Sequence, residues 1–417
     1  MSVITTSRRT FSSLALHRNY RLYFYGQVVS LSGTWMQNVA MAWFIVVLTH
    51  SAIAVGVLAA CQFGPYALFG LVGGALADRL EQRRLLLMTQ SAFMLSAAAL
   101  AGLALAGHAA AWQVFVLAAV NGMVTVFDTP ARQSFTIQMV GRNELPNAIA
   151  LNSSLFNASR IIGPAIAGAL IAVAGVGLCF LLNAFSFLAV IGALGLMRER
   201  ELYPVARDEK VQNVLRGAAE GLRFAWRLPL LRTVLLMMLL ISTIGINFNV
   251  LMPVLASQTM HAGPAIFGIL SATFGAGALA GALFSATLGR ASARALLAGA
   301  AVFAAAELVL APLRVAWAAA AVLVIVGFAF SLYSSQSNAA LQLNTPDRLR
   351  GRVMGIYGYV FFGTAPLGGM LAGWLAAVGS TELAFLVAGA VSLATALYGR
   401  VELAREAGLP RHAASTA

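Results

Sequence analysis

The chain has 417 residues, of which 60% are hydrophobic and 10% are charged, and its mean hydropathy is +0.84. This composition excludes an ordinary soluble protein and is typical of an all-α integral membrane protein. The net charge of +13 is large, but its basic residues flank apolar blocks, so we interpret it as a signal of membrane topology and expect no nucleic-acid partner.

Six charge-poor blocks follow one another along the chain, at residues 22–77, 85–127, 145–197, 233–289, 295–346 and 353–399. A transmembrane helix needs about 20 apolar residues, so each block predicts a hairpin of two helices and the chain predicts twelve. Apart from Arg160 and Arg314, every Lys and Arg lies outside these blocks. The positive-inside rule therefore places both termini in the cytoplasm of a multi-pass protein, and the Arg- and Ala-rich composition suggests a bacterial cytoplasmic (inner) membrane.

The second half of the chain repeats landmarks of the first half at a near-constant offset. Arg21 corresponds to Arg232, and Asn38 corresponds to Asn249. We therefore predict two six-helix pseudo-repeats joined by a polar linker that contains an amphipathic helix. The predicted segments are an N-terminal tail (1–21), an N-terminal bundle (22–197), the cytoplasmic linker (198–232), a C-terminal bundle (233–400) and a C-terminal tail (401–417).

Amides lie near the predicted midplane of the first helix of each repeat. Gln37 and Asn38 lie in the first half, and Asn247 and Asn249 take similar positions in the second. Such groups are costly in a membrane unless they face protein or a water-filled cavity. With Trp35 they are candidates for the lining of a substrate cavity, and packing with interhelical hydrogen bonds is the alternative.

A charged loop at residues 78–84 separates the first two apolar blocks. Asp78 follows a helix C-terminus, where the helix dipole disfavours an anion, so we expect it to pair with an Arg or with the N-terminus of another helix. We predict a conformational latch on the cytoplasmic side. Its residues are Gly74, Asp78, Arg79, Arg83, Asp128, Arg132 and Gly351.

Two carboxyl groups are candidates for coupling transport to protons. Asp128 lies near the cytoplasmic end of the predicted fourth helix, where desolvation and a neighbouring Arg act in opposite directions on its proton affinity. Glu307 lies in the predicted ninth helix. The simpler interpretations are an ion-pair latch for Asp128 and an outer salt bridge with Arg314 for Glu307.

Arg160 lies about 20 Å into the predicted fifth helix. A permanent guanidinium at this depth must face the bundle interior and find carbonyls, a carboxylate or an anionic ligand. Gly163, Pro164 and Gly168 follow on the same helix, where they allow bending and close packing.

The loop pattern of Gly74, Asp78, Arg79 and Arg83 resembles the loop between helices 2 and 3 of the major facilitator superfamily. Gly163-Pro164 with Gly168 resembles the helix-5 motif of its exporters. Other stretches resemble the branch that contains the enterobactin exporter and macrolide efflux pumps; these are residues 18–21, 33–36, 127–133, 147–152 and 345–354. The resemblance implies proton antiport, by alternating access, of drug-like or siderophore-like amphipathic molecules. It implies no cofactor, with a proton gradient as the energy source, and we expect a monomer.

Other functions have less support in the sequence. Uptake by proton symport has the same topology, and a non-transporting sensor or assembly protein is the alternative of another class. An enzyme is not expected. Lys210, the only lysine, is followed by Val, so no Gly-rich phosphate loop ending in Gly-Lys-Ser/Thr is present. The histidines are scattered and the two cysteines lie in predicted spans, so we predict neither a metal site nor a disulfide.

Overall fold

The computed structural model describes residues 11–77, 79–204 and 214–408, which form helices and no strands. The first half contains α2 (Ser12–Leu16), α3 (Arg18–Thr49), α4 (Ala52–Ala77), α5 (Gln82–Leu105), α6 (Ala111–Ala174) and α7 (Val176–Gly195). The connection contains η1 (Glu199–Glu201) and α8 (Val214–Arg227). The second half contains α9 (Pro229–Leu240), η2 (Ile241–Gly245), α10 (Phe248–Val254), η3 (Leu255–Thr259), α11 (Pro264–Thr287), α12 (Ala293–Leu310), α13 (Ala316–Leu343), α14 (Asp347–Gly363) and α15 (Ala365–Gly408).

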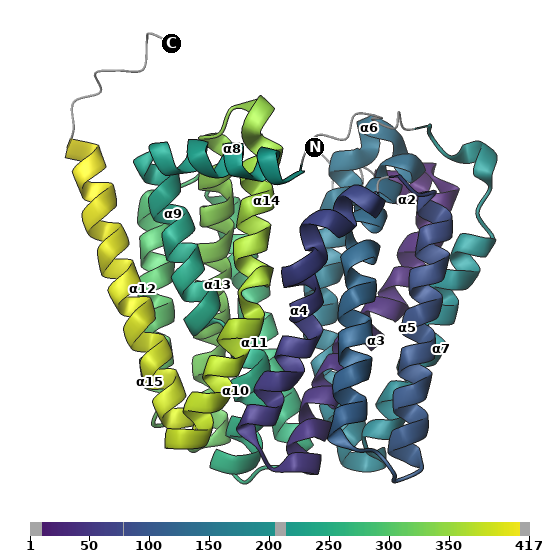
Figure 1. The fold of residues 1–417 in the computed structure, drawn as a ribbon, viewed down its shortest axis with the longest axis horizontal. Coiled ribbons are helices and arrows are strands. Elements are labelled where there is room, and N and C mark those ends of the chain that lie inside the picture. The colour runs from purple at the N-terminus through teal and green to yellow at the C-terminus, as the bar shows by residue number, and fades with distance from the viewer. Residues whose placement is uncertain (1–10, 78, 205–213, 409–417) are drawn as a thin grey trace, which may run out of the picture.

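The helices form two bundles that stand side by side (Figure 1). Within the described residues, 10 helical stretches are long and apolar enough to cross a membrane. Two of them have 64 and 58 residues, and each is interrupted by a non-helical backbone, at Gly141 and at Gly379–Ser380. A turn between two passes requires such a break. The all-α membrane fold is confirmed, and the count of twelve stays a prediction that rests on these two breaks.

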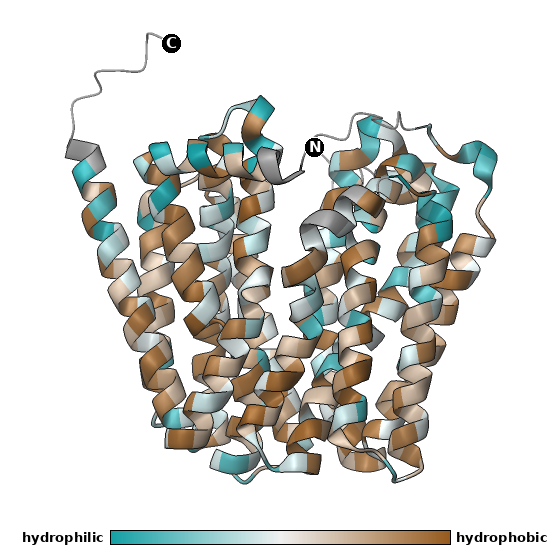
Figure 2. Ribbon diagram, viewed as in Figure 1, coloured by the Kyte–Doolittle hydropathy of each residue, from teal (hydrophilic) through white to brown (hydrophobic). Residues whose placement is uncertain are grey.

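Both ends of the described chain lie on one side of the molecule (Figure 1), which we call the terminal face and define by α2, α8 and the end of α15. The turns after α3 and α5 lie on the opposite face. Hydrophobic residues fill the middle of the bundle, and hydrophilic residues gather near the terminal face (Figure 2). The helices α3 and α9 begin a few residues before the apolar blocks, because Arg18, Arg21 and Arg232 belong to their first turns.

The helix α8 lies across the terminal face of the second half (Figure 1), at the position of the predicted amphipathic helix. Residues 205–213 of the predicted linker lie outside the described residues. Ala225 is buried, whereas Leu222 and Trp226 are exposed as in a helix at a membrane interface. Glu220 forms an ion pair with Arg352 of α14. This contact ties the connecting segment to the second half.

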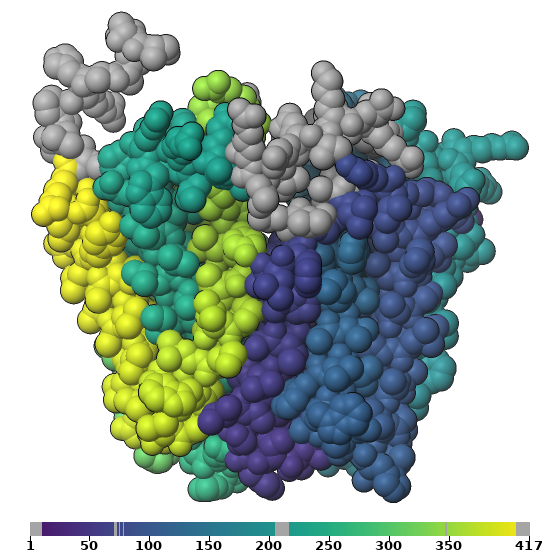
Figure 3. Space-filling model, in the orientation of Figure 1, coloured from purple at the N-terminus to yellow at the C-terminus, as the bar shows by residue number. Residues whose placement is uncertain are grey.

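The two halves meet through closely packed helices. Figure 3 shows α4 against α14 and α15, and the Tyr359 hydroxyl of α14 donates a hydrogen bond of 2.6 Å to the Ala67 carbonyl of α4. Near the opposite face, Gly56 of α4 packs on Gly369: a Cβ at Gly56 would lie 2.6 Å from the Gly369 carbonyl oxygen. Glycines let helices approach this closely because they have no side chain.

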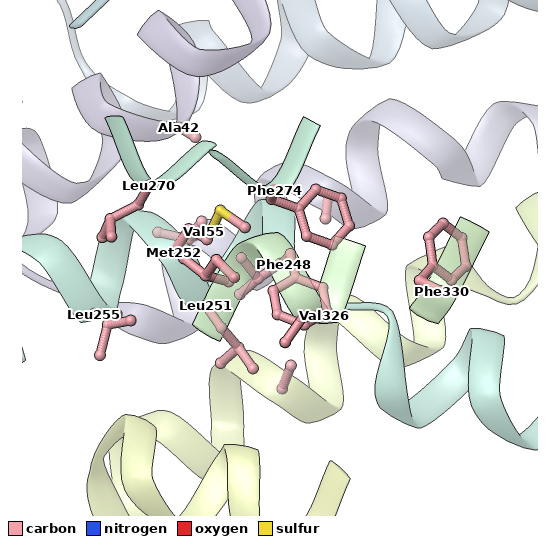
Figure 4. Packing of buried hydrophobic residues seen from close by; sticks show 14 of the residues in the cluster. Ala42, Val55, Phe248, Leu251, Met252, Leu255, Leu270, Phe274, Val326 and Phe330 are labelled. Carbon is pink, nitrogen blue, oxygen red and sulfur yellow. The ribbon is translucent and has the colours of Figure 1, made fainter. Parts of the chain in front are cut away.

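The core of the second half is rich in phenylalanine. The rings of Phe248 and Phe274 stack with centroids 4.9 Å apart, and Phe330 lies 6.3 Å from Phe274 (Figure 4). Aromatic pairs at these distances add to the free energy of burial. They join α10, α11 and α13, and of these helices α10 and α11 also contact the first half.

Candidate functional site

A buried polar cluster surrounds Asp128 of α6, whose residue is 4% exposed. Its Oδ1 accepts hydrogen bonds of 2.8 Å from Thr89 Oγ1 and 2.8 Å from Gln90 Nε2, both on α5. Its Oδ2 pairs with Arg132 Nη2 at 2.5 Å, one turn along the same helix. We call Asp128, Arg132, Thr89, Gln90 and Gln27 the acidic node. A carboxylate with three such donors is well compensated for its loss of water.

The acidic node joins three helices of the first half. Arg132 also donates to the Gln27 Oε1 of α3, so its guanidinium bridges α3 and α6 while Asp128 binds α5. The sequence predicted the group of Asp128 and Arg132 but missed Gln27, Thr89 and Gln90. The sequence could have indicated them, because each is a polar residue inside an apolar block. An unpaired polar group is costly there, so each of these side chains is expected to have a buried partner.

The loop residues lie apart from the acidic node. Arg83 of α5 forms an ion pair with Glu199 and donates a hydrogen bond of 2.9 Å to the Leu194 carbonyl, so it ties α5 to the end of α7. Arg79 is exposed, and Gly74 is partly buried in α4. Asp78 and its predicted pairing lie outside the described residues.

The predicted latch residues therefore fall into separate groups. Arg83 and the Asp128–Arg132 pair bind partners in the first half and in the connection that follows it. Gly351 lies in the first turns of α14 in the second half, and no described atom lies within 4 Å of a Cβ placed on it. Among the described residues, no polar contact of Arg83, Asp128 or Arg132 reaches the helices of the second half.

Glu307 of α12 is completely buried, with 0% of its surface exposed. The Ser392 hydroxyl donates a hydrogen bond of 3.0 Å to Glu307 Oε2, and within the described chain Oε1 has no partner. The predicted salt bridge with Arg314 is wrong. Arg314 instead pairs with Glu382 at 3.1 Å, because it lies in an exposed turn while Glu307 points into the bundle.

A break in the first helix of the second half lies beside Glu307. The π-helical turn η2 ends at Gly245, and the backbone leaves the helix at Ile246 before α10 begins. A Cβ at Gly245 would lie 3.6 Å from Glu307 Oε2 and 2.8 Å from the Ser392 hydroxyl. Short π-helical segments often mark functional positions, and this one brings a deformable backbone next to a buried carboxyl group.

Arg160 of α6 lies where the two halves meet. Its guanidinium carbon is 5.8 Å from the ring centre of Trp35 on α3 and 5.0 Å from that of Phe274 on α11. These distances are typical of cation–π contacts. The side chain thus faces the bundle interior as predicted from its depth, and it touches both halves.

The helix-5 motif residues have distinct packing roles. A Cβ at Gly163 would lie 2.5 Å from the Trp35 Cβ, so Gly163 lets α6 approach α3. The Pro164 carbonyl oxygen lies 2.9 Å from a Cβ placed on Gly268 of α11, and Gly168 faces the same glycine. This part of α6 therefore forms a contact between the halves near the opposite face.

The residues predicted to line a cavity divide into two groups. Asn38 and Asn249 are exposed and Trp35 is partly exposed. Gln37 is buried and accepts a hydrogen bond of 2.8 Å from Asn183 Nδ2 of α7. Asn247 is buried as well, and its side chain donates to the Thr243 carbonyl at 2.9 Å, where it closes the helix break. Gln37 therefore forms an interhelical hydrogen bond, as the alternative interpretation expected, whereas the hydrogen bond of Asn247 is local to its own broken helix.

Two helical bundles with polar and charged groups buried inside them define a membrane transporter of the major facilitator type. The family model described as "Transmembrane secretion effector" matches residues 9–410. The chain belongs to this family. Its described residues contain no group of three or more His, Cys, Asp or Glu side chains that could hold a metal ion.

Known relatives match over most of the chain. The multidrug efflux pump Tap of Mycolicibacterium fortuitum is 30% identical over 388 residues, which cover 91% of this chain and 94% of that protein. Macrolide efflux protein A of Streptococcus pyogenes is 24% identical over 394 residues, which cover 91% of this chain and 96% of that protein. The staphyloferrin A transporter of Staphylococcus aureus is 27% identical over 60% of this chain and 62% of its own length.

Solved structures have the same fold. The nucleoside transporter NupG superposes with a TM-score of 0.71 over 92% of this chain and 99% of that chain, at 12% identity. A bacterial homologue of the iron transporter ferroportin superposes with a TM-score of 0.69 over 94% of this chain and 99% of its own, at 17% identity. At these identities the likeness concerns the fold alone.

Proposed function

We propose that the protein exports small amphipathic molecules, drug-like or siderophore-like, in exchange for protons. The observation that carries this proposal is that, among the described residues, each half buries a carboxyl group, Asp128 in the first and Glu307 in the second. Groups that bind and release protons inside a membrane are typical of proton-driven transporters. The efflux functions in the names of Tap and macrolide efflux protein A support the direction of transport.

Alternating access supplies the mechanism of this proposal. The halves rock about a central site, which opens to one side of the membrane at a time. Glycine contacts such as Gly168 with Gly268 join the halves near the opposite face, whereas the described latch residues at the terminal face bind within one half. With the terminal face in the cytoplasm, this arrangement corresponds to a state closed to the outside. In the outward-facing state, the latch around Asp78 and Arg83 would close the cytoplasmic side.

The cytoplasmic placement of the terminal face rests on the positive-inside rule, since Arg18, Arg21, Arg83 and Arg352 lie there. The membrane is then the bacterial cytoplasmic membrane with both termini inside. We further propose that the transporter is a monomer that needs no cofactor beyond the proton gradient.

Everted membrane vesicles test the proposal. The vesicles contain the protein and have an acidic interior, and dyes, macrolides and siderophores are added in turn while the internal pH is recorded. Export in exchange for protons raises the internal pH on addition of a substrate. Proton symport lowers it, because substrate and proton then enter together. Vesicles without the protein give the background.

Variants then assign the coupling group. Asp128→Asn and Glu307→Gln each remove one buried carboxyl group, and Glu382→Gln is the matched control because its carboxylate is 41% exposed. We expect the pH change to vanish in at least one of the first two variants and to persist in the control. A pH change of normal size in both would contradict proton coupling through these groups. No response to any compound, with the protein present in the membrane, would contradict export.

A further inference from the structure

The surroundings of Arg160 contain aromatic rings and, among the described residues, no anion. Trp35 and Phe274 flank the guanidinium, and the ring of Phe156 lies 5.5 Å from that of Trp35. On the other side Phe274 stacks on Phe248. The cation therefore lies between an aromatic pair of the first half and an aromatic pair of the second half.

Arg160 differs from the other arginines that reach into the bundle. Arg132 and Arg83 each pair with a carboxylate and also donate to an uncharged oxygen. Within the described part of the chain, Arg160 has neither a hydrogen bond nor an ion pair, although its side chain is only partly exposed. A guanidinium has five N–H donors, and withdrawing them from water without an acceptor costs free energy that cation–π contacts offset only in part.

Arg160 lies at the junction of the two halves, which is where transporters of this architecture bind their substrates. It lies eight residues, or about 12 Å, closer to the terminal face than the glycine contact at Gly168, along the same helix. It contacts one aromatic ring from each half, so a rocking motion of the halves changes the distances between these rings and the guanidinium. A ligand bound there would interact differently with the two conformations, which is the requirement for a transported molecule to shift their populations.

We propose that Arg160 binds the anionic group of the transported molecule, and that its substrates include amphipathic aromatic molecules with a carboxylate, sulfonate or phenolate. The rings of Trp35 and Phe274 provide stacking surfaces for the apolar part, and the guanidinium provides a planar fork of donors for the anion. This inference rests on the proposed transport function and specifies its substrate class.

A pair of matched probes tests the inference. The dyes 8-anilinonaphthalene-1-sulfonate and N-phenyl-1-naphthylamine share their rings, and only the first has a sulfonate. Binding of each is measured by fluorescence to the full-length protein in nanodiscs of phosphatidylcholine, with empty nanodiscs subtracted. The zwitterionic lipid keeps anionic headgroups out of the site, so the anion comes from the probe. A second series with added phosphatidylglycerol shows whether an anionic lipid competes.

The expected result is a loss of affinity for the sulfonate probe of about tenfold in Arg160→Gln, with a smaller loss in Arg160→Lys. The neutral probe should bind equally well to all three proteins. Arg314→Gln is the matched control, because Arg314 pairs with Glu382 in an exposed turn. Equal sulfonate affinity in wild type and Arg160→Gln would overturn the inference. An equal loss for both probes would overturn it as well, since it would report a damaged apolar site.

The vesicle assay separates this inference from the proposed export. If no compound changes the internal pH but the affinity for the sulfonate probe falls in Arg160→Gln, the proposed export is contradicted and the anion site is supported. If a neutral compound drives proton release but the affinity for the sulfonate probe is the same in Arg160→Gln as in the unchanged protein, the proposed export is supported and the anion site is contradicted. The apparent unfolding temperature of each variant confirms that the compared proteins are folded.

Discussion

Gly168 of α6 and Gly268 of α11 meet backbone to backbone between the two halves. A Cβ placed on Gly168 would lie 2.8 Å from the Cα of Gly268, and a Cβ placed on Gly268 would lie 2.6 Å from the Cα of Gly168. On the other side of the bundle, a Cβ placed on Gly373 of α15 would lie 3.2 Å from the Cα of Gly56. The contact between the halves near the opposite face therefore depends on glycine at both edges.

We predict that Gly268→Val opens the opposite face. The added side chain overlaps α6 only when the halves are closed there, which destabilises this state by about 1–3 kcal/mol. A penalty of this size shifts a two-state population about 5- to 150-fold. Electron spin resonance distances between labels at His108 and Val315, in turns of the two halves, should lengthen in the variant.

Gly192→Val is the matched control for this experiment. No described atom lies within 4 Å of a Cβ placed on Gly192 of α7, so the same substitution adds no overlap there. The label distance in this variant should equal that of the unchanged protein. An unchanged distance in Gly268→Val as well would contradict a role of the glycine contact in holding the face closed.

A second prediction concerns the energy of the Asp128–Arg132 pair. Asp128→Asn leaves the Arg132 guanidinium without its carboxylate in a largely buried place, and Arg132→Gln leaves the carboxylate without its cation. Each single change should cost about 2–3 kcal/mol, less than for a fully buried pair because the Arg132 side chain is 30% exposed. The double variant Asp128→Asn/Arg132→Gln should cost less than the sum of the two.

Thermal unfolding of the purified variants measures this difference. Residues in one hydrogen-bond network are expected to show non-additive effects, whereas independent residues show additive ones. Arg405→Gln is the control, since Arg405 pairs with Glu402 near the exposed end of α15. Additive losses of stability at Asp128 and Arg132 would show that the pair is not energetically coupled.

Much of the fold was predictable because helix length and charge position are local properties of a sequence. The charge-poor blocks predicted the membrane helices, and the spacing of Asp128 and Arg132 places both on one helix face. The depth of Arg160 correctly predicted that its side chain faces the bundle interior. Each of these inferences used only distances along one helix.

The remaining features depend on contacts between distant helices. Thr89 and Gln90 reach Asp128 only because α5 packs on α6, and the rotation of α5 about its axis is not encoded in its own sequence. The wrong pairing of Glu307 with Arg314 has the same origin. The two residues are close along the chain, but Arg314 lies beyond the end of α12 and pairs with Glu382, which follows the break in α15.

The last prediction is that Glu307 binds a proton in this conformation. Its carboxyl group is fully buried, receives one hydroxyl donor from Ser392, and within the described residues has no cation within ion-pair distance. An isolated buried charge costs several kcal/mol, so the neutral acid is the stable form there. Asp128 is the internal contrast, because Arg132 compensates its charge.

Glu307→Gln should therefore leave thermal stability nearly unchanged, because glutamine has the shape and the charge of the protonated acid. Glu307→Ala should lower the free energy of unfolding by about 2–4 kcal/mol through the cavity that it leaves. The infrared spectrum of the unchanged protein should show the carbonyl band of a protonated carboxylic acid. This band should be absent from the spectrum of Glu307→Gln and present in that of Asp128→Asn. If the band is missing from the unchanged protein, or persists in Glu307→Gln, Glu307 is not the protonated group, and coupling through the second half loses its support.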